Sequence, residues 1–137
     1  YDSNFGNTKK IVDVVAQELQ GESLSVNDVN TNTLQGVGLL VVGSPINAWR
    51  PTIKIKTWLE SLKDNTLSNI KAAAFDTRIK VWFSGNAAKK ISRSLESKNA
   101  NIITAPQGFY IKENESPLLK KEIENAKKWA KKIRSKL

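Results

Sequence analysis

The chain has 137 residues, enough for one domain with a hydrophobic core, and 39% of its residues are hydrophobic. It contains no cysteine and no histidine, which excludes disulfides, thiol nucleophiles, imidazole acid–base chemistry and Cys/His metal sites. The cysteine-free composition predicts a cytoplasmic protein. The net charge of +9 leaves three classes of partner open: nucleic acid, an anionic membrane surface or an acidic protein.

The first part of the chain is predicted to alternate between helix and strand. Residues 8–20 carry apolar side chains at four-residue spacing, which predicts a helix that Gly21 closes. Residues 22–29 predict a short strand. Residues 37–42 form a continuous apolar run, typical of a strand that is buried on both faces. A second helix is expected to begin at Pro51.

The alternation continues to the end of the chain. Residues 70–75 predict a second buried strand, and Asn86 is expected to cap the helix that follows it. A third core strand is predicted over residues 101–105, with 109–111 as an extension. Pro117 is expected in the first turn of a last, lysine-rich helix.

This order of elements predicts a single α/β domain over residues 1–137 with a mostly parallel sheet. The polar turn at residues 3–8 should follow a strand, yet only Tyr1 and Asp2 precede it. We therefore expect roughly five residues of β-strand upstream, from the typical length of strands.

Three loops are expected at the carboxyl ends of the strands, where open parallel sheets bind ligands. Residues 3–8 form a glycine-containing turn at a helix N-terminus, where backbone N–H groups hold phosphate. Residues 43–51 present Trp49 in a loop bracketed by prolines, and residues 76–85 offer a carboxylate, a guanidinium and aromatic rings. Together the loops suit a ligand with a phosphate at one end and a flat ring at the other.

Simpler readings of the same residues stay open. The turn at residues 3–8 can be only a strand-to-helix connection, and Trp49 can fill the core. Asp76 and Arg78 can pair with each other at little energetic gain. Trp129 lies off the main apolar stripe of the last helix, so we expect it to be half exposed and assign it no role.

Three segments resemble the flavodoxin family. Tyr1–Thr8 resembles the phosphate loop of the family, Leu40–Ile46 resembles the third strand with its Gly-Ser-Pro turn, and Ala74–Thr77 resembles the loop on the other side of the flavin. The resemblance implies a flavodoxin-like, doubly wound, five-stranded parallel sheet of order 2-1-3-4-5. Its first strand would lie largely upstream of Tyr1.

The resemblance also implies non-covalently bound FMN and three groups of cofactor-binding residues, with no metal and no catalytic residue. The group around the phosphate and ribityl chain is Ser3, Asn4, Phe5, Gly6, Asn7 and Thr8. The group along one side of the isoalloxazine ring is Ser44, Pro45, Ile46, Asn47, Ala48 and Trp49. The group at the pyrimidine and ribityl edge is Asp76, Thr77, Arg78, Ser84 and Gly85.

The function that this resemblance implies is electron transfer by bound FMN to a redox partner protein, an acidic one to complement the charge of +9. One alternative is an FMN-dependent NAD(P)H:quinone-type reductase. Another is a binding module that has lost the cofactor and uses its lysines on a polyanion. Recognition of nucleic acid is disfavoured because the lysine-rich last helix lacks interleaved exposed aromatics.

Overall fold

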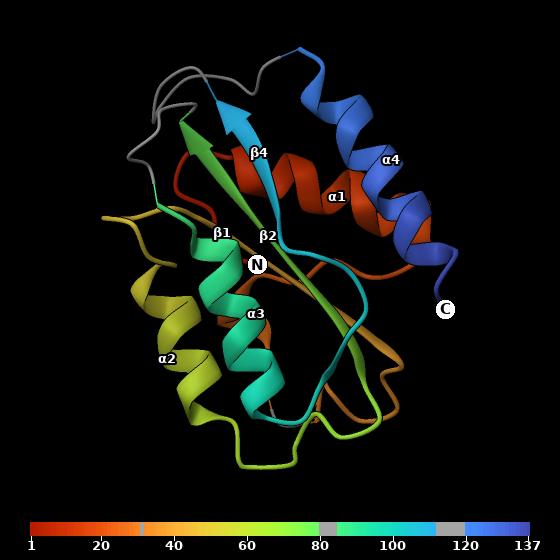
Figure 1. The fold of residues 1–137 in the computed structure, drawn as a ribbon. Helices are drawn as coiled ribbons and strands as arrows, with labels where there is room; N and C mark the ends of the chain where they lie inside the picture. Colours follow the sequence, from red (N-terminus) through yellow and green to blue (C-terminus); the bar gives the residue numbers. More distant parts are fainter. Residues whose placement is uncertain (31, 80–84, 112–119) are drawn as a thin grey trace.

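The computed structural model describes residues 1–30, 32–79, 85–111 and 120–137, and it is an α/β structure (Figure 1). The helices are α1 (Asn7–Leu19), α2 (Ile53–Ser61), α3 (Ala87–Ser97) and α4 (Glu122–Arg134), with a 3-10 turn η1 (Val26–Asp28). The strands are β1 (Leu39–Pro45), β2 (Lys71–Ile79), β3 (Asn101–Ile102) and β4 (Gln107–Ile111). No helix in the described ranges has the length and apolar character needed to cross a membrane.

The described sheet is parallel throughout and is centred on β2. One edge of β2 pairs with β1, in a register that places Ser44 opposite Asp76. Its other edge pairs first with β3 and then with β4, which sets Asp76 opposite Gly108. β3 and β4 therefore occupy one strand position in two pieces. Pro106 lies in the break, where its missing N–H cannot join a ladder.

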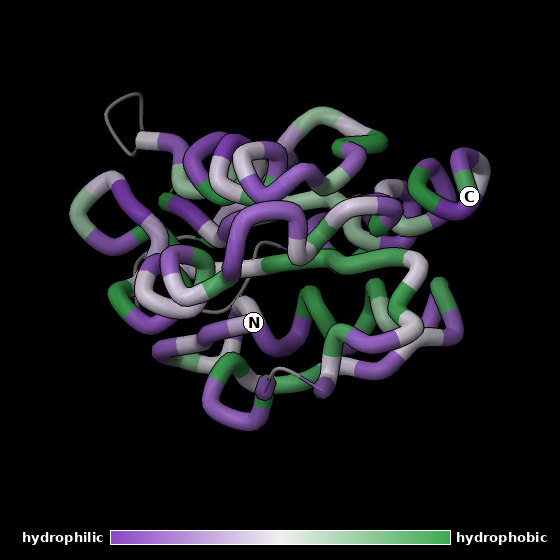
Figure 2. Tube along the Cα trace, turned by 90° about the horizontal axis from the view of Figure 1, so that it is seen from below, coloured by the Kyte–Doolittle hydropathy of each residue, from purple (hydrophilic) through white to green (hydrophobic). Residues whose placement is uncertain are grey.

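The sheet separates two hydrophobic layers. On β2, Ala73 and Phe75 pack against α1 and α4, while Ala72 and Ala74 pack against α2 and α3. This alternation follows from the two-residue period of a strand. Figure 1 shows α1 beside α4 and α2 beside α3. Figure 2, which colours the Cα trace by hydropathy, shows hydrophobic segments that run through the middle of the molecule. Residues 72–77 are fully covered as a result.

Trp129 lies in the core, so the expectation that it is half exposed was wrong. Only 5% of its surface is exposed. Its ring makes edge-to-face contacts with Phe75 at 5.8 Å and with Phe109 at 5.9 Å between centroids. The physical reason is that α4 packs against both α1 and the sheet, so its buried face is wider than a single stripe.

Other element predictions need correction as well. Residues 22–29 form no strand in the structure, because among the described residues only Tyr1 offers them a backbone partner there. The predicted strand 101–105 is a strand over two residues only. The left-handed residue that ends α1 is Gln20, with φ 53°, rather than Gly21. Pro117 lies outside the described residues.

Candidate functional site

The three predicted loops meet at the carboxyl end of the sheet, and Thr77 at the end of β2 connects them. Its hydroxyl shares a 2.9 Å hydrogen bond with the hydroxyl of Thr8 in the first turn of α1. Its carbonyl accepts a 3.0 Å bond from the backbone N–H of Ile46 in the second loop. The sequence prediction that these loops share one end of the sheet is confirmed.

The first loop turns sharply at Gly6 and opens directly into α1. Gly6 adopts a φ of 89°, which only glycine adopts at little cost, and as the N-cap residue it has no side chain with which to cap the helix. The N–H of Gly6 donates to the hydroxyl oxygen of Ser3 at 3.1 Å, and the N–H of Ser3 donates to the carboxylate of Asp2 at 2.9 Å. The bond that Ser3 accepts uses an oxygen lone pair and not the hydroxyl hydrogen.

The side chains of this loop divide into two sets. Asn4 and Phe5 point into solvent, and 55% of the surface of Phe5 is exposed. Asn7 and Thr8 are buried, and the hydroxyl of Thr8 is engaged with Thr77. A ligand at this helix end would therefore meet backbone N–H groups and the outward side chains first.

The second loop is a tight turn that presents an exposed tryptophan. Asn47 and Arg50 exchange two backbone hydrogen bonds, of 2.7 Å and 3.1 Å. The residues between them, Ala48 and Trp49, have φ angles of 49° and 64°, the pattern of a type I′ turn. Non-glycine residues in this region cost about 1–2 kcal/mol each. The strained turn leaves 58% of the Trp49 surface exposed.

The buried hydroxyl of Ser44 holds the start of this second loop in place through hydrogen bonds. Ser44 is fully buried, and its hydroxyl donates to the carbonyl of Pro45 at 2.8 Å and accepts from the N–H of Thr52 at 3.0 Å. Thr52 in turn caps α2 by accepting from the N–H of Ile55. These bonds engage the Ser44 hydroxyl within the turn between β1 and α2. Pro45 and Ile46 are half buried beside it.

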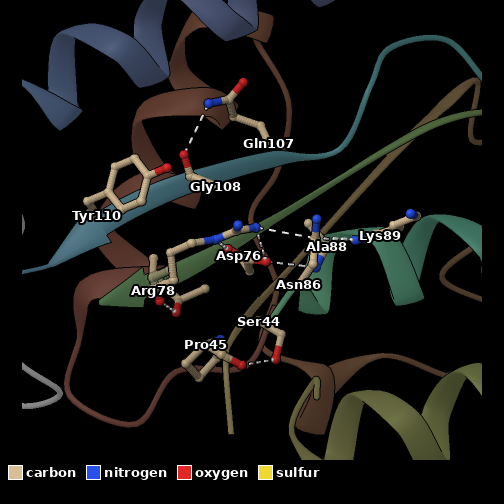
Figure 3. Close-up of polar contacts among 12 residues, drawn as sticks. Ser44, Pro45, Asp76, Arg78, Asn86, Ala88, Lys89, Gln107, Gly108 and Tyr110 are labelled. Atoms are coloured by element: carbon tan, nitrogen blue, oxygen red, sulfur yellow. Dashed lines mark hydrogen bonds and ion pairs between the residues drawn. The ribbon is translucent and has the colours of Figure 1, made fainter. Parts of the chain in front are cut away.

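An ion pair in the last residues of β2, before the third loop, joins this strand to α3 (Figure 3). The guanidinium of Arg78 donates twice to the carboxylate of Asp76, at 2.6 Å and 2.7 Å. The same carboxylate accepts from the N–H of Ala88 at 2.8 Å. Arg78 also donates to Asn86, which caps α3 as predicted by accepting from the N–H of Lys89. Asp76 and Arg78 thus position the start of α3.

The charge state of Asp76 depends on this pairing. Burial raises the pKa of the Asp76 carboxyl above its ordinary value, because the charged form loses its water. The Arg78 guanidinium and the Ala88 N–H oppose that rise by stabilising the carboxylate. Without the guanidinium, a negatively charged Asp76 side chain at this buried position would destabilise the folded protein.

Two glycines lie at positions of the site where a larger side chain would clash with a neighbouring residue. Gly85 has a φ of 81°, and a Cβ placed on it would lie 2.7 Å from the Cβ of Trp49. The third loop therefore packs against the strained turn of the second. A Cβ on Gly108 in β4 would lie 2.5 Å from the Nε of Arg78. Gly108 was not among the residues predicted for the site, although a glycine inside a strand is itself a sign of close approach. Ser84 lies outside the described residues.

The apolar surface of the described residues is concentrated at this end. Their exposed large hydrophobic side chains are Phe5, Trp49, Ile53 and Leu137, and the first three stand in or beside the first and second loops. The described residues hold no group of three acidic, histidine or cysteine side chains that could bind a metal ion. The site therefore offers an uncapped helix N-terminus and exposed aromatic rings.

The comparisons with known proteins concern the fold. No family model matches the chain, and no curated protein matches its sequence. Oxidised Flavodoxin 1 from Bacillus cereus superposes with a TM-score of 0.83 over 99% of this chain and 95% of that one, at 14% identity. A flavodoxin from the domain Archaea gives a TM-score of 0.81 over 98% and 92% of the two chains, at 16% identity.

A larger protein contains the same architecture. The rubredoxin oxygen:oxidoreductase of Desulfovibrio gigas superposes with a TM-score of 0.80 over 98% of this chain but only 34% of that one, at 19% identity. The parallel sheet, the two helical layers and these superpositions agree with one another. The chain has a flavodoxin-like fold.

Proposed function

We propose that this protein binds FMN at the carboxyl end of its sheet and serves as an electron carrier. The observation that carries the proposal is the uncapped N-terminus of α1, which opens from a left-handed glycine beside exposed aromatic side chains. Bound FMN would supply one- and two-electron redox chemistry, so the chain needs no acid or base of its own.

The electrostatics of α1 favour an anion at its start. The first turn carries Lys9 and Lys10 and no acidic residue, although the helix dipole favours negative charge there. The starts of α2 and α3 differ, because Thr52 and Asn86 cap them with side-chain oxygens. A phosphate group at α1 would accept from backbone N–H groups and offset the unfavourable charge.

The exposed rings suit the flavin end of the ligand. Trp49 and Phe5 offer flat apolar surfaces in two loops that Thr77 connects. An aromatic ring gains free energy when it leaves water by stacking. In this proposal Trp49 contacts the ring system, Ser3 and Asn4 contact the phosphate, and Phe5 covers the ribityl chain. Asp76 and Arg78 hold the start of α3 in place.

Titration with FMN and with riboflavin tests the proposal, since riboflavin has the ring but no phosphate. Flavin fluorescence should be quenched on binding, and FMN should bind at least about tenfold more tightly, the worth of one charge-assisted hydrogen bond. Asn4→Asp places a negative charge in the loop at nearly constant shape. It should weaken FMN about tenfold and leave riboflavin within about twofold.

Asn101→Asp is the matched control. Asn101 is also exposed, but it begins β3 at the amino end of the sheet. The same change of charge there should leave both affinities nearly unchanged. Equal affinity for the two flavins, or equal effects of the two substitutions, would count against a phosphate site at α1.

A further inference from the structure

The charges of the first three helices run against the helix dipole. Each of them has two lysines among its first four residues and a glutamate as its next-to-last residue. The lysines are Lys9 and Lys10 in α1, Lys54 and Lys56 in α2, and Lys89 and Lys90 in α3, and the glutamates are Glu18, Glu60 and Glu96. The dipole favours the reverse order, with acidic residues first and basic residues last. Helix stability therefore does not explain where these lysines stand.

The starts of α2 and α3 lie together at the carboxyl end of the sheet. The N–H of Thr52, directly before α2, donates to Ser44 in β1. The N–H of Ala88 in α3 donates to Asp76 in β2, which lies opposite Ser44 across the sheet. Figure 1 shows α2 and α3 side by side. The lysines at the two helix starts therefore belong to one surface of the molecule.

This surface carries an excess of positive charge. Residues 43–59 and 85–95, which contain both helix starts, include no aspartate and no glutamate. Lys54, Lys89 and Lys90 are exposed, and no carboxylate of the described residues lies within ion-pair distance of them. Lys56 reaches Glu60 only at 3.8 Å, and both of these side chains are largely exposed. The charge of the other three lysines is therefore not balanced within the described fold.

The proposed phosphate site does not account for these lysines. Lys9 and Lys10 stand beside the N–H groups of α1 that would hold the phosphate. At α2 and α3, by contrast, Thr52 and Asn86 already supply oxygen acceptors to the N–H groups of the first turn. The lysines of α2 and α3 are therefore available to another anionic partner.

An exposed isoleucine stands among these cations. Ile53, the first residue of α2, is 77% exposed, more than any other large hydrophobic side chain of the described residues. Arg50 and Lys54 are its exposed basic neighbours along the chain. An apolar centre with a polar or charged rim is the composition of a protein–protein interface. A nucleic acid would satisfy the lysines with its phosphates and leave Ile53 in water.

We propose that Arg50, Ile53, Lys54, Lys89 and Lys90 form the docking surface for an acidic protein. Carboxylates of the partner pair with the basic side chains, and an apolar side chain of the partner covers Ile53. The surface lies at the same end of the sheet as the proposed flavin site. Only the purpose of docking, electron transfer, rests on the proposed function, because the surface itself needs no FMN.

Titration calorimetry of the chain with cytochrome b5, a small acidic haem protein, tests the proposal. At about 0.1 M salt, where charges more than about 10 Å apart are screened, the double variant Lys54→Glu/Lys89→Glu should bind at least about tenfold more weakly than the unsubstituted chain. Both substitutions place a carboxylate where the helix dipole favours it, so the thermal unfolding midpoint should stay the same or rise. This readout separates loss of docking from loss of folding.

The matched control is Lys128→Glu/Lys131→Glu, which makes the same change of net charge on α4. Both lysines are exposed, and α4 packs on the opposite face of the sheet from α2 and α3. The control should weaken binding by less than about threefold. Equal weakening by the two double variants, or no binding of cytochrome b5 to the unsubstituted chain, would overturn the proposal. So would binding to duplex DNA or to phosphatidylglycerol vesicles that Lys54→Glu/Lys89→Glu abolishes while cytochrome b5 still binds. No arm contains FMN, so this inference and the proposed function fail separately.

Discussion

At the scale of single residues, the turn at Ala48 and Trp49 is the clearest case of local strain. Both residues hold positive φ angles that glycine and asparagine usually supply in a type I′ turn. Strained backbone of this kind gathers at functional sites, where the surrounding structure fixes it. Here the turn leaves more than half of the Trp49 surface exposed, where a ligand can reach it.

Ala48→Gly should stabilise the protein by about 0.5–1 kcal/mol, because glycine removes the cost of the left-handed conformation. Urea unfolding measures the change. Ala16→Gly, in the interior of α1, is the matched control and should destabilise by about 1 kcal/mol. Destabilisation by both substitutions would show that the turn is not strained as described.

At the scale of elements, the buried pair of Asp76 and Arg78 connects β2 to the start of α3. Because the pKa of Asp76 is raised in the folded state, the folded chain binds this proton more readily than the unfolded chain. The contribution of Asp76 to stability is therefore largest in acid and falls as pH rises through the folded pKa. Arg78 limits that fall.

Arg78→Gln should destabilise by about 3 kcal/mol at pH 7, where it leaves a buried carboxylate without its cation. The loss should shrink in acid, below the folded pKa of Asp76, since a protonated carboxyl needs no guanidinium. Urea unfolding across this pH range measures it. Adding Asp76→Asn should recover most of the stability at pH 7, and a loss independent of pH would contradict the assignment.

The elements with strong local signals could be predicted from the sequence. The apolar runs at 37–42 and 70–75 correctly predicted two buried strands, and the Asn86 cap was correct, because each depends on neighbours close in the chain. The strand ends were wrong, since β1 continues to Pro45 and β2 to Ile79, so Ser44 and Asp76 lie in strands and not in loops. The strand at 22–29 could not be judged locally, because a strand forms only where a backbone partner lies beside it. For the same reason, the sequence could not show that Ser44 and Asp76 use their polar groups inside the fold.

At the scale of the whole molecule, the charge of +9 bears on redox behaviour. Reduction adds negative charge to a flavin, and a positive surround favours the more negative state. We therefore expect a higher midpoint potential for the fully reduced couple than in an acidic protein of the same fold.

The same charge gives a test within one protein. The midpoint potential of FMN bound to it should fall as salt is raised from about 0.01 M to about 1 M, because the screening length shrinks from about 30 Å to about 3 Å. Spectroelectrochemistry at the two salt concentrations measures the difference. If the midpoint potential rose with salt or did not change, the positive charge of the protein would not be the cause of a raised potential.

In the proposed complex, a phosphate group lies at the start of α1 and the flavin ring lies against Trp49. NMR chemical-shift mapping tests it most directly, by following backbone amides and tryptophan indole signals as FMN is added to the protein. We expect large shifts at the amides of Gly6 and Thr8 and at the indole of Trp49, with Trp129 in the core unaffected. Shifts confined to the lysines of α4, or no shifts at saturating FMN, would contradict it.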